Sequence, residues 1–394
     1  MNYIQRGTPE FSRTNWALFA AGFITFMNLY ITQPILPLFS KEFDVSPAFA
    51  SLSLSLTTFS LAVSLVIVGS LSEAWGRKRM MTISIFTASI LTLAIAFSPT
   101  FEVLLVLRII QGVAFAGLPA IAMAYLGEEM NSRDLGMAMG LYISGNSVGG
   151  LAGRIIMGTL TDLFNWQVGM ICIGVLSLLI SIYFVTALPQ SKHFKPQKLQ
   201  LGSLTSSLFS HLKDTTLLKL YGIGFLLMAS FVTLYNYIGF KLLAPPYSLS
   251  TTIVGGIFIV YLVGTVSSTW FGNLANKHGR QRILLSGIAL MLIGSLITLN
   301  SILFLKIIGI TILTFGFFGA HSIASSWVSY RAKHDRAQAS SLYLFFYYFG
   351  SSVGGTAGGF LWSKFGWEGV IALITFFLLI SFVLVILLKA RNKK

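Results

Sequence analysis

Long apolar segments follow one another through almost the whole chain, and they constrain the fold more than any other feature of the sequence. An α-helix needs roughly 17–25 apolar residues to cross a bilayer, and these segments have that length. Hydrocarbon tolerates only structures whose backbone hydrogen bonds are satisfied internally, and the segments are too long to be strands of a membrane barrel. The sequence therefore predicts an all-α membrane protein.

Twelve segments qualify as spans, and the longest polar segment divides them into two sets of six. The first set covers 16–39, 48–71, 80–98, 103–127, 136–160 and 167–187. The second set covers 217–240, 251–272, 282–300, 303–328, 338–361 and 368–388. We therefore expect an N-terminal six-helix bundle at 1–188, a cytoplasmic linker at 189–215 and a C-terminal six-helix bundle at 216–394.

The composition agrees with a membrane protein, because only 10% of the residues are charged while 55% are hydrophobic. Soluble domains carry about 25% charged residues. The formal net charge of +15 would suggest a nucleic-acid partner in a soluble protein, but here the charges lie in short connectors between apolar segments. We read them as a topology signal and expect membrane lipid, not nucleic acid, as the partner.

The positions of the basic residues predict the orientation of the chain. If both termini are cytoplasmic, most of the 27 lysines and arginines fall on the inside, as the positive-inside rule requires. The exceptions are Lys41, Lys241, Lys306 and Lys364 on or near the outside, and Arg108 and Arg154 within helices. We expect a multi-pass protein of the plasma (cell inner) membrane with both termini in the cytoplasm.

Two motifs recur at the same place in each half of the chain. The loop 69–79 and the loop 272–282 share Gly, Leu, Gly, Arg and Arg in register. The segment Gly145–Gly150 is matched in the same way by Gly350–Gly355. Such parallel repeats indicate two pseudo-symmetric halves related by an axis along the membrane normal, with a binding site between them.

These motifs resemble those of the major facilitator superfamily over the whole chain, and most closely its drug/proton and sugar-efflux antiporters. The family's loop motif is matched by Gly69, Leu71, Glu73, Gly76, Arg77 and Lys78, with Glu73 where the family usually has Asp. Arg108, Gln111 and Gly112 resemble its fourth-helix motif. Gly145–Gly150 resembles the fifth-helix motif of the antiporters, with Asn146 in place of the usual proline.

The resemblance implies a conformational lock at the cytoplasmic side. Glu73 would lie by the start of the eleventh helix, and Arg77 would pair with Glu128 or Glu129 at the end of the fourth. The alternative is that Arg77 serves, with its basic neighbours, only as a topology signal. The second copy has Asn276 where the first has its acid, so its lock should be weaker; the residues of the two copies are Gly69, Glu73, Gly76 and Arg77, and Gly272, Asn276, Gly279 and Arg280.

Glycines in the fifth and eleventh helices predict close helix packing, because they put smooth, small faces on a helix. They are Gly145, Gly149, Gly150 and Gly153 in the first half, and Gly350, Gly354 and Gly355 in the second.

Two arginines lie inside predicted spans, where a guanidinium is costly unless it faces a partner or a wet cavity. For Arg108, in the fourth span, a functional role competes with a side chain that reaches out to the outer interface. Arg154, in the fifth span, could serve function or extend towards Asp162.

No carboxylate lies near the midplane of the predicted spans, so a proton carrier is not obvious. The first span offers Asn28, Tyr30, Thr32 and Gln33 in place of the acid found there in many antiporters. His321, in the tenth span, could exchange protons near neutral pH or serve only as a hydrogen-bonding group. Glu73, Glu128 and Glu129 are further candidates.

The resemblance also implies that the first, fourth, seventh and tenth helices line a central cavity. Candidate contacts for substrate or coupling are Asn28, Tyr30, Gln33, Arg108, Gln111, Tyr125, Arg154, Asn236, His321 and Trp327. Pockets of this kind are mostly apolar with a few convergent polar groups. Alternatively, several of these residues are anchors at the membrane interface.

The sequence contains no phosphate-binding loop, zinc cluster or nucleophile–base arrangement, so we expect neither an enzyme nor a cofactor or metal. The leading interpretation is a monomeric secondary transporter that exports a small drug-like, amphipathic or sugar-like solute by alternating access, in exchange for protons. The alternatives are a uniporter or importer of an anionic metabolite, and a membrane sensor that transports nothing.

Overall fold

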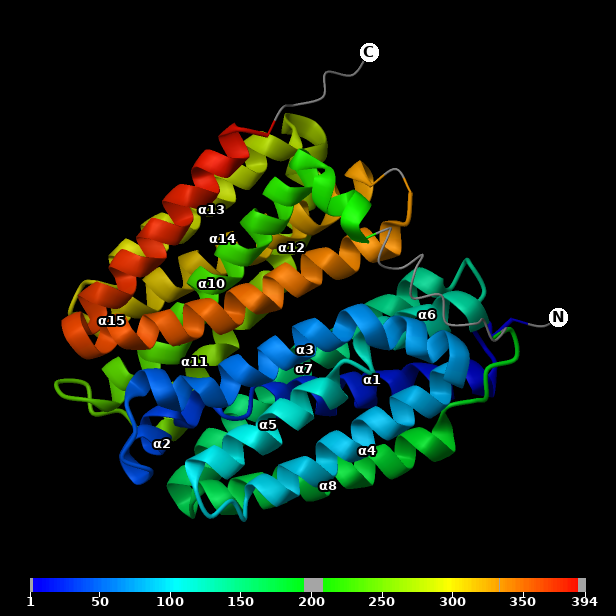
Figure 1. Cartoon of the computed structure of the whole chain (residues 1–394), viewed down its shortest axis with the longest axis horizontal. Helices are drawn as coiled ribbons and strands as arrows, with labels where there is room; N and C mark the ends of the chain where they lie inside the picture. The colour runs from blue at the N-terminus through cyan, green and yellow to red at the C-terminus, as the bar shows by residue number, and fades with distance from the viewer. Residues whose placement is uncertain (1–2, 195–207, 333, 389–394) are drawn as a thin grey trace. The chain divides into compact units, whose positions relative to one another are not determined.

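The computed structural model describes residues 3–194, 208–332 and 334–388, and these fold into helices joined by short connections (Figure 1). No β-strand occurs in these ranges beyond one isolated bridge between Ile4 and Met130. Much of the predicted linker, 195–207, lies outside the described residues.

The described chain groups into two compact units. The first holds the described residues within Met1–Ile35, Leu56–Gln200 and Ser250–Gly256. The second holds those within Leu36–Ser55, Leu201–Leu249 and Ile257–Lys394. The division at 188 and 216 inferred from the polar linker stays a prediction.

The helices of the first half are α1 (Pro9–Leu29), η1 (Gln33–Ile35), α2 (Leu36–Glu42), α3 (Pro47–Trp75), α4 (Arg77–Ile95), α5 (Phe101–Phe115), α6 (Pro119–Glu129), α7 (Leu135–Leu163) and α8 (Trp166–Ala187). Those of the second half are α10 (Thr215–Leu243), α11 (Thr251–Ile257), η2 (Phe258–Leu262), α12 (Val263–His278), α13 (Arg280–Ile297), α14 (Leu303–Arg331) and α15 (Arg336–Ile386).

Ten helical segments of the described chain are long and apolar enough to cross a bilayer. Two further spans complete the predicted set. The helix α7 has the length, but its glycines, Asn146 and Arg154 lower its mean hydropathy. The helix α15 contains two spans, because Gly366 (φ 60°, ψ −143°) interrupts it. The protein is therefore an all-α membrane protein with twelve spans in two pseudo-symmetric bundles, as the sequence predicts.

The first helix begins earlier than the apolar pattern indicates, at Pro9 instead of Trp16. Thr8 caps this helix by accepting a hydrogen bond from the amide of Phe11, and Pro9 occupies the first helical position. Proline is favoured there because its missing N–H would have no helical partner in any case. Capping thus extends the helix through polar residues that hydropathy alone assigns to the tail.

The repeat in the loop motif is also a repeat in backbone conformation. Gly76 separates α3 from α4 with φ 95° and ψ 140°, and Gly279 separates α12 from α13 with φ 90° and ψ 141°. A residue with a Cβ rarely adopts such positive φ angles. The shared glycine therefore makes the same sharp reversal of the chain in both halves.

Glycines also set how closely α7 packs on α1 in the first unit. A Cβ added at Gly145, Gly149 or Gly153 would lie 2.0–2.7 Å from a backbone oxygen of α1. In the second unit, Gly350 and Gly354 of α15 meet the backbone of α10 in the same way, and the two helices run side by side (Figure 1). These contacts are between backbones, as in other membrane helices that pair through small residues.

Two of the predicted packing glycines face side chains. A Cβ on Gly150 would lie 3.4 Å from the guanidinium of Arg154, and one on Gly355 would lie 2.8 Å from Ser55 and 2.9 Å from Asn236.

We predict that Gly149→Ala destabilises the protein, because its Cβ would lie 2.0 Å from the carbonyl oxygen of Phe23. Overpacking of this kind costs about 1–3 kcal/mol. The matched control is Gly140→Ala on the same helix, where an added Cβ meets nothing within 4 Å. Thermal unfolding of the detergent-purified variants should show a lower midpoint for Gly149→Ala and an unchanged or slightly higher one for Gly140→Ala. Equal midpoints would contradict the packing.

Candidate functional site

The first span, Pro9–Glu42, is interrupted towards its C-terminal end. The helix α1 ends at Leu29, a short 3-10 turn follows at Gln33–Ile35, and α2 begins at Leu36. Pro34 lies within the interruption and cannot donate a backbone hydrogen bond. A helix that stops there leaves carbonyl groups at its end that need other donors.

Arg108 of α5 supplies those donors. Its Nη1 donates to the carbonyl oxygen of Asn28 at 3.0 Å and its Nη2 to that of Leu29 at 2.7 Å. Nη1 also donates to Oε1 of Gln111 at 2.6 Å, and the side chain is completely buried. A cation at the carbonyl end of a helix is also favoured by the partial negative charge there. Arg108 therefore closes the end of the first helix.

Hydrogen bonds extend from Gln111 through three more helices. The amide nitrogen of Gln111 donates to the hydroxyl of Thr92 on α4 at 2.7 Å, and Thr92 donates to Oδ1 of Asn28 at 2.6 Å. Asn28 in turn donates to Ser177 on α8 at 2.8 Å. The sequence identified Asn28, Arg108 and Gln111 as candidates but missed Thr92 and Ser177, because several hydroxyl side chains recur along both helices and none stands out.

Arg154 of α7 holds the other side of the same interruption. Its Nε donates to Oε1 of Gln33 at 2.8 Å, and its Nη1 donates to the carbonyl oxygen of Gly150 at 2.6 Å. The guanidinium lies over the ring of Tyr30, 4.3 Å from its centre. The two buried arginines thus contact the break in the first span from different helices.

Asp162, the acid towards which Arg154 could extend, has other partners. It accepts hydrogen bonds from the amides of Thr251 and Thr252 and from the hydroxyl of Thr252, at 2.6–3.1 Å.

Among the candidates of the second unit, His321 lies in an aromatic cluster. Nδ1 of His321 and the hydroxyl of Tyr343 are 2.9 Å apart, and the imidazole lies against the rings of Phe317 and Tyr347. Asn236 is buried, and Trp327 is only partly buried.

Tyr125 lies at the cytoplasmic end of the fourth span by the predicted topology, apart from the interruption. Its hydroxyl donates to the carbonyl oxygen of Pro189 at 2.9 Å.

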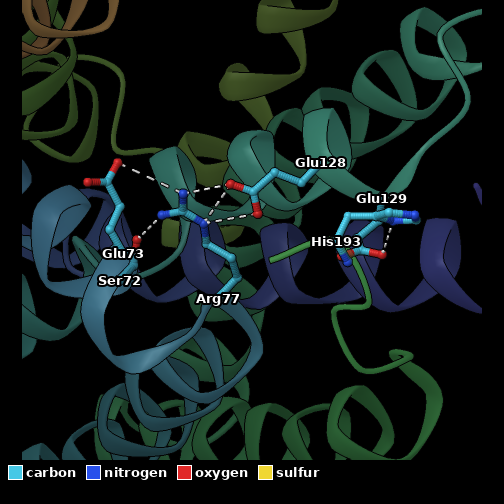
Figure 2. Close-up of polar contacts among 6 residues, drawn as sticks. All are labelled: Ser72, Glu73, Arg77, Glu128, Glu129 and His193. Atoms are coloured by element: carbon cyan, nitrogen blue, oxygen red, sulfur yellow. Dashed lines mark hydrogen bonds and ion pairs between the residues drawn. The ribbon is translucent and has the colours of Figure 1, made fainter. Parts of the chain in front are cut away.

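The loop motif of the first half brings Arg77 against Glu128 (Figure 2). Nη2 of Arg77 lies 2.7 Å from Oε1 of Glu128, and Nε lies within 3.3 Å of both carboxylate oxygens. Nη1 donates to Ser72 at 2.5 Å. Glu73 lies 3.9 Å from Arg77, with 46% of its side chain exposed. The sequence left Glu128 and Glu129 open as partners, and the structure pairs Arg77 with Glu128.

Glu129 faces the other way and contacts His193 (Figure 2). The backbone N–H of His193 donates to Oε1 at 2.8 Å, and Nδ1 lies 3.0 Å from Oε2. His193 follows the sixth span by only a few residues, and no sequence pattern links it to the end of the fourth.

The second copy of the loop motif makes different contacts. Arg280 lies over the ring of Tyr330, 4.0 Å from its centre, and Asn276 is exposed. A Cβ on Gly272 would meet nothing within 4 Å, and the side-chain surroundings of its counterpart Gly69 lie outside the described residues.

An ion pair next to this second copy joins Arg331 at the end of α14 to Asp214, which caps α10. Burial alone would raise the pKa of the Asp214 carboxyl. Hydrogen bonds from the amides of Leu217 and Thr216 and from Arg331 outweigh it, so the pKa is lowered. Asp214 therefore stays ionised and keeps capping α10 near neutral pH.

Comparison with known proteins identifies the family. The family model described as Major Facilitator Superfamily matches residues 18–267 and 224–394. The chain is 56% identical over 381 residues to the MFS-type transporter YybF of Bacillus subtilis (strain 168), a match covering 97% of this chain and 94% of that protein. The chain belongs to the major facilitator superfamily. It is therefore a multi-pass membrane transporter and not an enzyme.

Further proteins are similar to this chain at lower identity. The inner membrane transport protein YnfM of Escherichia coli (strain K12) is 44% identical over 379 residues, which cover 96% of this chain and 91% of that protein. The multi-drug resistance efflux pump PmrA of Streptococcus pneumoniae is 25% identical over 358 residues, covering 88% and 89%. The crystal structure of a mutant of the nucleoside transporter NupG superposes with a TM-score of 0.77 at 16% identity, covering 96% of this chain and all of that one.

We predict that Arg108→Gln lowers the stability of the fold, because it leaves buried carbonyl groups at the end of α1 without their donors. Each such group costs about 1–3 kcal/mol. The stability of Arg108→Lys should lie between those of the wild type and Arg108→Gln, since an ammonium keeps the charge but lacks the planar set of N–H donors of a guanidinium. The thermal unfolding midpoint should be highest for the wild type, lower for Arg108→Lys and lowest for Arg108→Gln. The exposed Arg79→Gln should have the midpoint of the wild type. A stable Arg108→Gln protein would contradict this role.

Proposed function

We propose that this superfamily member exports a small drug-like, amphipathic or sugar-like solute in exchange for protons. The observation that carries the proposal is the break in the first span, where amide, phenol and guanidinium groups converge in an otherwise apolar helix layer. Transporters bind substrate and coupling ions at discontinuous helices, because the interrupted backbone offers polar groups at membrane depth.

The direction of transport is inferred from two likenesses. The glycine segment of α7 resembles the fifth-helix motif of antiporters, and its Gly145 and Gly149 lie against the backbone of α1. The efflux pump PmrA is a distant relative over most of the chain. Both favour export over import.

The groups at the break also suit a polar, uncharged part of a solute. Asn28, Gln33 and Gln111 provide amides, while Arg108 and Arg154 donate to neutral oxygens. The competing proposal, a uniporter or importer of an anionic metabolite, is favoured by the two guanidinium groups. Arg154→Gln distinguishes them: loss of anion transport with export of neutral solutes retained would support the import of anions.

The chain's orientation, oligomeric state and coupling ion belong to the same proposal. We infer cytoplasmic termini from the basic connectors, a monomer because each half is a complete six-helix bundle, and protons as the coupling ion from the resemblance to antiporters. Among the described residues, no cluster of three or more His, Cys, Asp or Glu side chains could hold a metal.

Transport by the purified protein tests the function. A thermal-shift screen first selects solutes, because a ligand that binds only the folded protein raises its apparent stability, by about 2.7 kcal/mol at a hundredfold excess over Kd. In liposomes, a selected solute should move against its gradient when a pH gradient is imposed, and a protonophore should abolish this movement. If solutes move equally with and without any pH gradient, proton coupling is refuted and a uniporter is supported.

The pair Arg77–Glu128 is proposed to be part of the cytoplasmic lock, so Arg77→Ala should lower turnover. We expect a several-fold lower rate with normal membrane insertion and unchanged solute affinity, because the pair lies away from the break in the first span. Glu128→Gln should have a similar effect, and the exposed Arg79→Ala, two residues along α4, should not. If Arg77→Ala transports at the wild-type rate, the lock is refuted and Arg77 serves only as a topology signal.

A further inference from the structure

Glu129 differs from every other acid of the chain in its burial. All 12 aspartates and glutamates lie in the described residues, and Glu129 alone among them is buried, with 2% of its side chain exposed. A carboxylate out of water needs a charged or hydrogen-bonding partner to stay ionised. Its partner is His193, which contacts both carboxylate oxygens (Figure 2).

Two further segments close around this pair. The ring of Tyr3 stacks on the imidazole of His193 with 4.4 Å between ring centres. The backbone N–H of Ile4 donates to the carbonyl oxygen of Glu129 at 2.9 Å, and the N–H of Asn131 donates to the carbonyl oxygen of Ile4 at 2.9 Å. The N-terminal segment thus covers the same end of α6 that His193 contacts.

The chain between α8 and His193 is fastened to the first unit as well. The hydroxyl of Tyr125 donates to the carbonyl oxygen of Pro189, and the ammonium of Lys78 donates to that of Leu188 at 2.5 Å. Phe194, next to His193, lies 5.5 Å from the guanidinium carbon of Arg77. We call residues 188–194 the strap, since they run from the last helix of the first half across α6 to the Arg77–Glu128 pair.

We propose that Glu129 and His193 form a proton-binding site that couples the cytoplasmic pH to the attachment of the strap. When the imidazole carries a proton, it forms an ion pair with Glu129 and holds the strap, with Phe194 beside Arg77. When the proton leaves, the ion pair is lost and the strap is held less tightly. The inference rests on the proposed function where it puts this site on the cytoplasmic side and where it assigns the site to the lock.

The direction in which attachment of the strap depends on pH follows from the charges around the imidazole. Glu129 and Glu128 on α6 favour the protonated imidazole, and Asp134 nearby in sequence adds to them while it accepts from the amide of Arg6. Arg77 and Lys78 on α4 and Lys192 in the strap oppose them at longer range, and Tyr3 faces the ring as a neutral group. Glu129 is the charged group in direct contact with the ring, 3.0 Å from Nδ1, and an opposite charge at that distance favours the protonated imidazole. Attachment is therefore strongest at low cytoplasmic pH and weakens as the pH rises.

The contacts favour this site over the other histidines of the chain. His321 contacts Tyr343 and aromatic rings inside the second bundle. His211 stacks on His334, 4.8 Å away, and the carboxylate of Asp335, 3.3 Å from Nδ1 of His334, is half exposed, unlike that of Glu129. An imidazole changes its charge between about pH 5 and 8. This change alters an attachment most where the imidazole contacts an ionised partner, because the ion pair is then gained or lost with the proton.

NMR titration of the full-length protein in nanodiscs tests the proton site without any transported solute. The chain has five histidines, so ¹³C-labelled histidine gives few resonances, and His193→Gln assigns the one of interest. Glu129→Gln should lower the titration midpoint of His193, because it removes the negative charge in contact with the ring. Glu128→Gln, which alters the adjacent acid that binds Arg77, should shift it by less than half as much. An unchanged midpoint in Glu129→Gln would overturn the proposal.

A second measurement on the wild-type protein covers the case in which Glu129→Gln fails to fold. The amide of His193 donates to Glu129, so its hydrogen exchange, corrected for the intrinsic effect of pH, should become faster as the imidazole loses its proton. Constant protection across the titration of His193 would count against the switch.

Transport measurements then show whether a failure concerns the proton site or the proposed function. With an identified solute, His193→Gln should flatten the dependence of the rate on cytoplasmic pH and leave solute affinity unchanged. A shifted midpoint together with a wild-type pH profile would keep the proton site and refute its link to the lock. If no solute is transported at all, the proposed function fails while the NMR result for the proton site still stands.

Discussion

The need to satisfy every backbone polar group in hydrocarbon governs the central part of this protein. The first span stops being a helix at Leu29 and resumes at Leu36, which frees carbonyl groups of buried residues away from bulk water. The guanidinium of Arg108 donates hydrogen bonds to these carbonyl groups. Arg154 contacts the residues after the end of α1, through a hydrogen bond to Gln33 and stacking on Tyr30. Two costly buried cations are tolerated because the break they stabilise is itself polar.

The two halves keep the same backbone plan with different chemistry. Gly76 and Gly279 turn the chain in the same conformation, yet the arginine that follows pairs with a carboxylate in the first half and stacks on a tyrosine in the second. A stack of this kind depends little on salt or pH compared with an ion pair beside a titratable neighbour. At the loop motif itself, the ion pair that responds to charge is therefore found in the first half.

The sequence was sufficient for the spans, the repeat and the family, because apolar length and recurring glycines are local signals. It also identified most residues around the break, since polar side chains in apolar helices stand out. It could not show that Arg108 binds the end of α1, because that depends on where Pro34 and its neighbours interrupt the helix. Nor could it choose between Glu128 and Glu129, since adjacent helical residues point about 100° apart and only the packing decides which one faces Arg77. His193 was missed because its partner lies 64 positions away in the chain.

The backbone contact between α1 and α7 limits how these helices can shift along each other. Gly145, Gly149 and Gly153 recur at every fourth residue and meet Phe19, Phe23 and Met27, which recur with the same interval. A slip of one or two residues would bring a side chain of α7 against the backbone of α1, where only a glycine fits. A slip of four residues would again set glycines against the facing backbone, over a distance of about 6 Å. Sliding of this pair is thus confined to discrete steps of roughly one helical turn, and gradual displacement is blocked.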